Sequence, residues 1–132
     1  MVLAGMDELR DAWLNLKSYV DDLTHERQHY LDFFEQADAA YLVTDPRGKI
    51  LEANGAAVDL FDRRRADLRG KPLAALVSPE ERREFRRRLQ GLSRPARWRS
   101  AFASRGRRIE VELRARPIPQ ARGIVWLLRP SA

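Results

Sequence analysis

The sequence contains no cysteine. This absence excludes disulfide bonds, zinc sites built on thiolates and any cofactor that is attached through cysteine. No stretch approaches the run of about eighteen apolar residues that a membrane-spanning helix needs. The first ten residues mix acidic and apolar side chains, unlike a secretory signal peptide. These absences predict a cytoplasmic protein, and a length of 132 residues is ordinary for a single domain.

Acidic residues are scarce after the first forty positions. Residues 1–40 carry three basic and nine acidic side chains, a net charge of −6, whereas residues 41–132 carry 22 basic and ten acidic side chains, a net charge of +12. A basic body can bind nucleic acid. A genome-wide bias toward arginine and alanine explains the same excess, so nucleic-acid binding is kept as the alternative function. The acidic arm can also dock on the basic body, in the same chain or in a second copy.

Residues 6–35 contain neither glycine nor proline, which favours one long helix. Apolar side chains recur there at spacings of three and four, a period of about 3.5 that is typical of a seam between two helices. Arg27 interrupts the seam at one position. The seam residues are Leu9, Trp13, Leu16, Val20, Leu23, Tyr30 and Phe34. The pattern predicts that residues 1–35 form a dimerisation and capping helix shared with a second copy. The alternative is a single helix packed on its own domain.

After Asp38, short apolar runs alternate with turn residues. The runs 40–44 and 49–53 flank the turn Asp-Pro-Arg-Gly at residues 45–48 and predict a hairpin. Asn54 then precedes a short amphipathic stretch that ends at Phe61, as expected of a helix with an asparagine N-cap. The chain therefore changes from a helical arm to an α+β domain near residue 36.

The second half predicts a helix over residues 78–89, because a capping serine, a first-turn proline and two glutamates are typical of a helix start. Three strands follow, at residues 97–103, 108–116 and 123–128. The first two alternate between apolar and polar side chains, whereas the last is apolar on both faces. Such a strand is covered on both sides. We expect the domain's own helices on one face and the N-terminal helix or a partner subunit on the other.

Several short segments, in this order, resemble the PAS domain family. Residues 33–37 (Phe-Phe-Glu-Gln-Ala) resemble its first segment and residues 42–50 its first hairpin. Residues 52–61 resemble the asparagine-led helix that follows. Residues 68–73 and 77–81 resemble the next two segments. Each segment is weak by itself, but their order makes the resemblance specific from about Tyr30 to Pro130.

The resemblance implies an α+β fold over residues 36–130, in which a five-stranded antiparallel sheet carries short helices on one face around a hydrophobic pocket. It implies that Asp45 pins the hairpin turn, Gly48 takes a positive φ, and Asn54 ties the second strand to the next helix. Asp62 stands where the family often has glycine, so the loop there is expected to differ. Candidate pocket walls, which also fit a plain core, are Leu76, Phe85, Leu89, Trp98, Phe102, Val111 and Leu113.

The resemblance also narrows the cofactor. The flavin photosensors and the yellow-chromophore branch of the family require a cysteine, which this chain lacks, and the haem branch requires a histidine in the longest helix of the domain. Residues 79–90 contain no histidine, and His25 and His29 both precede the domain. A non-covalent small molecule or flavin is therefore expected, if any ligand binds, and haem or a covalent chromophore is not.

One motif is typical of an enzyme. His25-Glu26-Arg27-Gln28-His29 matches H-E-x-x-H, in which two histidines one helical turn apart bind zinc and the glutamate activates water. No further histidine follows as a third ligand, and no sheet precedes the helix to form a substrate groove. We therefore predict no metal site and no enzymatic activity, with a zinc metallopeptidase as a remote alternative.

The resemblance, together with the predicted seam, implies a homodimeric sensor and dimerisation module in bacterial signal transduction of the two-component type. Such a module passes the state of a ligand or partner to a histidine kinase or another output domain. No kinase, cyclase or DNA-binding segment is recognisable in the 132 residues. The expected partner is therefore a second copy of the chain or a signalling domain, and neither a membrane nor nucleic acid.

Overall fold

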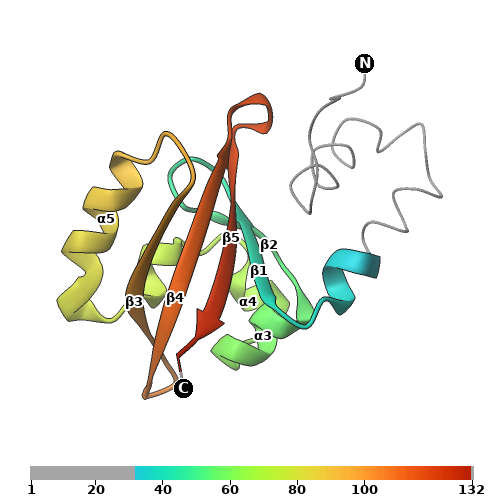
Figure 1. Ribbon diagram of the computed structural model, residues 1–132. Coiled ribbons are helices and arrows are strands. Elements are labelled where there is room, and N and C mark those ends of the chain that lie inside the picture. The colour runs from blue at the N-terminus through green and yellow to red at the C-terminus, as the bar shows by residue number, and fades with distance from the viewer. Residues whose placement is uncertain (1–31, 132) are drawn as a thin grey trace.

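The computed structural model describes residues 32–131. The predicted helix up to residue 31, its seam as far as Tyr30 and the histidine motif lie outside the described residues. After a helical turn at residues 32–36, five strands form one sheet (Figure 1). They are β1 (Ala40–Thr44), β2 (Ile50–Ala53), β3 (Ala96–Ser104), β4 (Arg107–Ile118) and β5 (Gly123–Pro130). The strand order is β2-β1-β5-β4-β3, and all neighbours are antiparallel.

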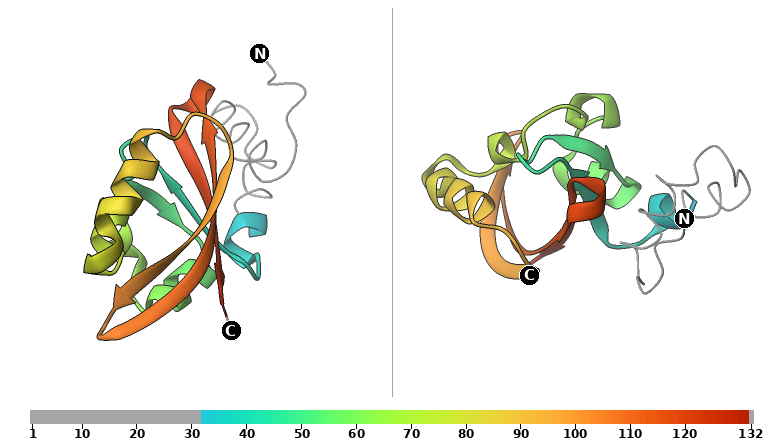
Figure 2. Two further views of the ribbon diagram at one scale, coloured as in Figure 1. Left: turned by 60° about the vertical axis from the view of Figure 1, so that its left-hand side comes forward. Right: turned by 90° about the horizontal axis from the view of Figure 1, so that it is seen from above.

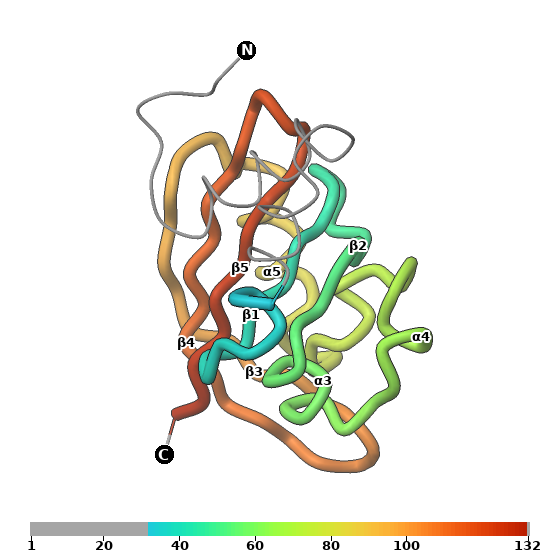
Figure 3. Tube along the Cα trace, turned by 90° about the vertical axis from the view of Figure 1, so that its right-hand side faces the viewer, coloured from blue at the N-terminus to red at the C-terminus, as the bar shows by residue number. Residues whose placement is uncertain are grey.

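Short helices cover one face of this sheet. They are α3 (Gly55–Phe61), α4 (Arg65–Leu68), η1 (Leu73–Leu76), η2 (Pro79–Glu81) and α5 (Arg82–Gln90), and a further turn, η3 (Pro119–Ala121), joins β4 to β5. Figures 2 and 3 show α5 on one side of the sheet and residues 32–36 on the other, beside β1. Within residues 32–131, no helix is long and apolar enough to cross a membrane. The expected sheet with helices on one face is confirmed.

The predicted alternation along the strands is also confirmed. On β3, Trp98 and Phe102 are buried and face the helices, whereas Arg97 and Arg99 are exposed on the other face. We call this second face, opposite α3, α4 and α5, the outer face of the sheet. On β5 both faces are largely buried, because even Val125 on the outer face is only 7% exposed. The prediction of a doubly covered last strand therefore holds.

Two predicted boundaries were wrong. The helix expected over residues 78–89 is divided into η2 and α5, and the Ser78 side chain makes no capping hydrogen bond. Instead, the Ser78 amide donates to the carbonyl of Ala101 at 2.8 Å, because residues 77 and 78 run along the edge of β3. Strand β4 was expected to end before Pro117. The ladder continues for two further residues, with Pro117 opposite Ile124.

The turns that the resemblance singled out have the expected structure. The Oδ1 atom of Asp45 accepts hydrogen bonds from the amides of Arg47 and Lys49, both at 2.9 Å, and Gly48 has φ +89°. Asp62 has φ +53° and takes the left-handed conformation that ends α3. Aspartate tolerates this conformation better than most residues, so the chain turns here although the family's glycine is missing.

Candidate functional site

The seven predicted pocket residues all lie between the helices and the sheet. Leu76 comes from η1, Phe85 and Leu89 from α5, and the others from the helix-facing sides of β3 and β4. Six of them are buried, and Leu89 is half-buried at the edge of the core. The prediction therefore located one contiguous set of side chains.

Aromatic rings occupy the space between α5 and the middle of the sheet. Phe85 stacks on Trp126 with ring centroids 5.6 Å apart and an interplanar angle of 24°. Trp98 meets Trp126 edge-on at 5.9 Å and lies 6.1 Å from Phe85. Sequence reasoning did not single out Trp126, which is 0% exposed and central to the cluster. Its position in an apolar strand gave no signal that distinguished it from its neighbours.

The two tryptophans differ in their polar atoms. Trp126 donates from Nε1 to the hydroxyl of Thr44 at 2.9 Å, and this hydroxyl donates onward to the Asp45 carbonyl at 2.9 Å. Trp98 Nε1 is buried and has no hydrogen-bond partner among the described residues. The guanidinium carbon of Arg88 lies 5.4 Å from the Trp98 ring centroid, a cation–π distance. A buried donor without an acceptor costs about 1–3 kcal/mol, so Trp98 Nε1 is a position where a water or ligand oxygen would be stabilised.

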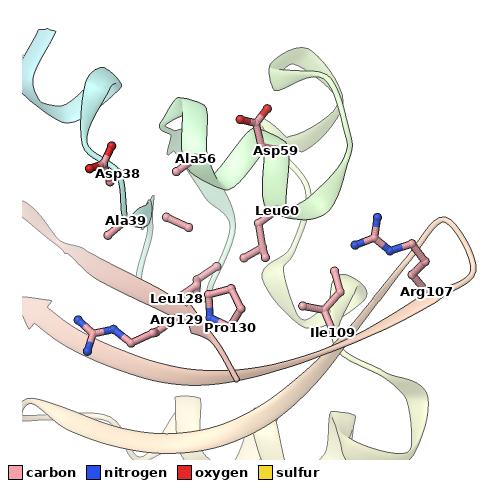
Figure 4. A pocket seen from close by; sticks show the side chains of 11 residues that line it. Asp38, Ala39, Ala56, Asp59, Leu60, Arg107, Ile109, Leu128, Arg129 and Pro130 are labelled. Atoms are coloured by element: carbon pink, nitrogen blue, oxygen red, sulfur yellow. The ribbon is translucent and has the colours of Figure 1, made fainter. Parts of the chain in front are cut away.

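A groove of about 680 Å³ opens at the end of the sheet beneath α3 (Figure 4). Its floor is apolar, with side chains from α3 on one side and from β4 and β5 on the other. The apolar lining residues are Ala39, Ala40, Ala56, Leu60, Ile109, Leu128 and Pro130. Leu60 and Ile109 face each other across its middle in Figure 4. Sequence reasoning missed this groove because its walls meet only through the pairing of the first and last strands.

Charged side chains stand around the groove. Asp38 and Asp59 lie toward the α3 side, and Arg107 and Arg129 project from the sheet (Figure 4). All four side chains are exposed, and none of them forms an ion pair within residues 32–131. The groove therefore offers an apolar floor with uncommitted charges of both signs at its rim.

Asn54 joins three segments at one end of the sheet. Its amide nitrogen donates to the carbonyls of Phe34 at 3.0 Å and Ala39 at 2.9 Å. Its Oδ1 accepts from the amides of Tyr41 and Ala57, both at 3.0 Å. The residue is 0% exposed, so each of these bonds is shielded from water. Asn54 therefore links the start of α3 to β1 and to the turn at residues 32–36.

Carboxylates protect the free edge of β3. The Oε1 of Glu81 accepts from the amide of Ala101 at 3.2 Å and from the hydroxyl of Ser100 at 3.3 Å. Arg108 on β4 donates to Glu81 at 3.1 Å and also to Glu80. The backbone hydrogen bond at Glu80, together with Arg108, lowers the pKa of the Glu80 carboxyl below its ordinary value of 4.5. These contacts hold η2 against the sheet and occupy part of an edge that could otherwise pair with another strand.

The described residues hold no cluster of three or more potential metal ligands. The two histidines of the H-E-x-x-H motif lie outside residues 32–131. Neither the predicted absence of a metal site nor the peptidase alternative is tested by the structure.

Comparison with known proteins agrees with this architecture. Residues 28–130 match the family described as PAS fold, and no curated protein matches the chain. The PAS domain of an HTR-like protein from Haloarcula marismortui has a TM-score of 0.74 at 16% identity, with 87% of this chain and 99% of that chain covered. A domain of a sensory box sensor histidine kinase/response regulator from Geobacter sulfurreducens has a TM-score of 0.65 at 22% identity, covering 83% and 98%.

A third structure includes a small molecule. It is the RpfR quorum-sensing receptor PAS domain of Cronobacter turicensis in complex with C12:0, with a TM-score of 0.65 at 15% identity, covering 74% of this chain and 97% of that chain. At these identities the structural likeness shows the fold alone. The sequence match spans both the sheet and the Asn54 junction, and on that match the chain belongs to the PAS fold family.

Proposed function

We propose that this PAS domain is a cytoplasmic sensor and dimerisation module of signal transduction. It passes the state of a small ligand or a partner to an output domain, as in two-component regulation. The similarity to a domain of a sensor histidine kinase supports this role, as does the similarity to a quorum-sensing receptor domain that was solved with C12:0. Under this proposal, the output domain or partner is a histidine kinase or another signalling domain.

The groove beneath α3 carries the proposal. Its volume of about 680 Å³ lies within the range of about 300–1,000 Å³ that small-molecule sites occupy. Its walls include Ala40 on β1 and Leu128 on β5, which are directly paired across the sheet. A small apolar molecule on Leu60 and Ile109 would therefore touch both the first and the last strand of the domain. Such a ligand can therefore shift β1 and β5 together, and with them the chain segments on either side of the sheet.

The interior set that begins with Leu76 and Phe85 is the second position for a ligand. A non-covalent small molecule or flavin there would have to displace the packed rings of Phe85, Trp98 and Trp126. Trp98 Nε1 favours this position, because it would supply a hydrogen bond to an acceptor. The groove requires no such displacement, and we therefore place the ligand there first.

Native mass spectrometry of the full chain tests the proposal. A retained ligand adds mass to the polypeptide, and dodecanoic acid serves as the added probe where none is retained. We expect Ile109→Glu to abolish binding, because it places a charge on the floor of the groove. Leu92→Glu, at a half-buried residue outside the groove, is the matched control. Unchanged binding in Ile109→Glu would move the site to the interior, and no bound mass in any sample would contradict a ligand sensor of this class.

The same spectra report the subunit number. We propose a homodimer joined by the predicted seam of Leu9, Trp13, Leu16, Val20, Leu23, Tyr30 and Phe34. Four heptads of this spacing support the proposal. A strictly monomeric chain at micromolar concentration would contradict the dimer without affecting the ligand site.

Nucleic-acid binding remains the second candidate because arginines gather on the outer face. Arg97 and Arg114 are directly opposite each other on β3 and β4. A protein that binds through such side chains loses affinity steeply as salt rises. Titration of labelled double-stranded DNA with the full chain decides the question, since an absence of binding at about 50 mM salt removes this candidate.

A further inference from the structure

Strand β3 lies at one edge of the sheet, and its free edge is paired over only part of its length (Figure 1). Val77 forms an antiparallel bridge to Phe102, and the Ser78 amide donates to the carbonyl of Ala101 at 2.8 Å. The amide of Ala101 donates in turn to the Glu81 carboxylate at 3.2 Å. Near Ala101, the chain therefore supplies its own short edge strand, followed by a carboxylate.

The rest of this edge, at Arg97 and Arg99, is open. Successive residues of a strand turn their backbone groups to alternate sides, so Arg97 and Arg99 share the outward direction of Ala101. Within residues 32–131, no hydrogen bond reaches the N–H and C=O groups of these two arginines from outside the sheet. Unpaired backbone groups in such a row are a template for a further strand.

Three arginine side chains stand beside the open part of the edge. Arg97 and Arg99 are exposed on the outer face, and Arg114 is directly opposite Arg97 on β4. None of these three side chains has an ion-pair or hydrogen-bond partner among the described residues. Like charges in directly paired positions are destabilising unless something compensates them. A carboxylate next to Arg97 would therefore stabilise this part of the sheet.

The paired part of the edge shows how acidic side chains are received there. Arg108 on β4 donates to both Glu80 and Glu81 of the covering segment. That segment is extended at residues 77 and 78 and becomes acidic directly afterwards. The open part has the same two elements that receive it, because it offers outward backbone groups on β3 and an arginine, Arg114, on β4.

The arginines also exclude a second copy of β3 as the added strand. Two such edges pairing over their open parts would place Arg97 and Arg99 of one copy against the arginines of the other. Charged side chains on edge strands prevent this kind of edge-to-edge association. A strand that adds here is therefore one of opposite charge.

We propose that the free edge of β3, at Arg97 and Arg99, binds an extended acidic segment of a partner protein as an additional strand. In an antiparallel addition, the partner residues opposite these arginines turn their N–H and C=O groups toward β3 and their side chains toward the outer face. The edge therefore selects acidic residues at alternate positions of the segment. This docking depends neither on a ligand in the groove nor on a dimer.

Binding of a synthetic peptide to the full chain tests the proposal. The probe is a fluorescein-labelled peptide of alternating glutamate and valine, followed by fluorescence anisotropy at about 50 mM salt. We expect Arg97→Glu with Arg99→Glu to weaken its binding by about tenfold, because two attractions become repulsions. The same variant should instead bind the matching peptide of lysine and valine. Arg83→Glu with Arg86→Glu, at exposed residues of α5, changes the net charge equally and should keep the preference for glutamate.

Two methylated peptides separate strand addition from charge attraction alone. Methyl groups on the glutamate amides block the N–H groups that face β3, so we expect binding to be lost. Methyl groups on the valine amides lie on the far side of the added strand and should leave the affinity unchanged. Equal affinity of the two methylated peptides would overturn the proposal and would favour a surface for polyanions such as nucleic acid.

Amide hydrogen exchange, measured by NMR, locates the added strand. The amides of Arg97 and Arg99 should exchange rapidly in the free chain and slow down when the glutamate peptide saturates it. The amide of Gly106, in the turn between β3 and β4, should not change. Protection confined to other segments, or no binding of the peptide at about 50 mM salt, would overturn the proposal.

Discussion

The side-chain amide of Asn54 donates to the carbonyl oxygen of Phe34 at 3.0 Å, across 20 positions of sequence. This bond attaches the turn at residues 32–36 to the junction between β2 and α3. A second contact strengthens the attachment, because Glu35 forms an ion pair with Arg65 at 2.5 Å. A displacement of the turn at residues 32–36 would therefore move the start of α3. This helix is also one wall of the groove.

We expect Asn54→Ala to lower the free energy of unfolding by about 3 kcal/mol. It removes a helix cap, worth about 1 kcal/mol, and leaves buried amides and carbonyls without partners, at about 1–3 kcal/mol each where water cannot enter. Urea denaturation of the full chain measures the loss. Gln36→Ala, at an exposed amide in the same region, is the control and should change little. A loss below about 1 kcal/mol for Asn54→Ala would mean that water replaces these bonds.

We expect Gly48→Ala to destabilise the domain more than Gly70→Ala. Both glycines have positive φ, +89° and +88°, so both substitutions carry a left-handed penalty of about 1–2 kcal/mol. A Cβ at Gly48 would also lie 2.9 Å from Cδ2 of Leu89, whereas nothing lies within 4 Å at Gly70. The difference between the two variants in denaturation midpoint therefore reports how tightly α5 packs on the hairpin. Equal midpoints would show that Leu89 moves aside freely.

Much of this fold could be predicted because its local signals agree with its tertiary contacts. Asp45 and Gly48 occupy a turn whose geometry requires those residue types, and Asn54 caps a helix that begins directly after it. The alternation on β3 fixed which side chains face the core. Each of these features depends on neighbours within a few positions, which a sequence pattern records.

The groove and the edge contacts could not be predicted, because they depend on pairings between distant segments. Leu60 and Ile109 are far apart in the sequence and come to line one groove only in the folded chain. Ser78 was interpreted as a helix cap, but its amide pairs with Ala101, and a local pattern does not reveal that a strand edge lies nearby. The central position of Trp126 follows from the strand order, which places β5 in the middle of the sheet.

The free energy of unfolding should decrease as the pH is lowered into the acidic range. The exposed carboxylates of η2 and α5 are the cause. Hydrogen bonds from Arg87 and Arg88 lower the pKa of Glu84 below 4.5, and the pKa of Glu80 is lowered as well. A carboxylate with a lowered folded-state pKa stabilises the fold above its unfolded pKa, and this contribution is lost as pH falls through the folded pKa. Glu80→Gln and Glu84→Gln should therefore flatten the dependence below about pH 4.5.

Urea midpoints measured across this range provide the check, and Asp59→Asn is the control at an exposed carboxylate without an ion-pair partner within residues 32–131. An unaltered acid limb in both glutamine variants would show that other groups set it. High salt should weaken the effect, because the ion pairs involved are exposed.

Trp126→Phe should cost about 1 kcal/mol more than Trp98→Phe, although both substitutions shorten a buried indole to a phenyl ring. Trp126 loses its hydrogen bond to Thr44, whereas Trp98 Nε1 has no partner to lose among residues 32–131. Denaturation of the two variants under the same conditions isolates this difference, since each leaves a void of similar size. If Trp98→Phe is as costly as Trp126→Phe, the Trp98 N–H has an acceptor in solution. Native mass spectrometry then separates a retained ligand, which leaves the protein with excess mass, from an ordered water, which does not.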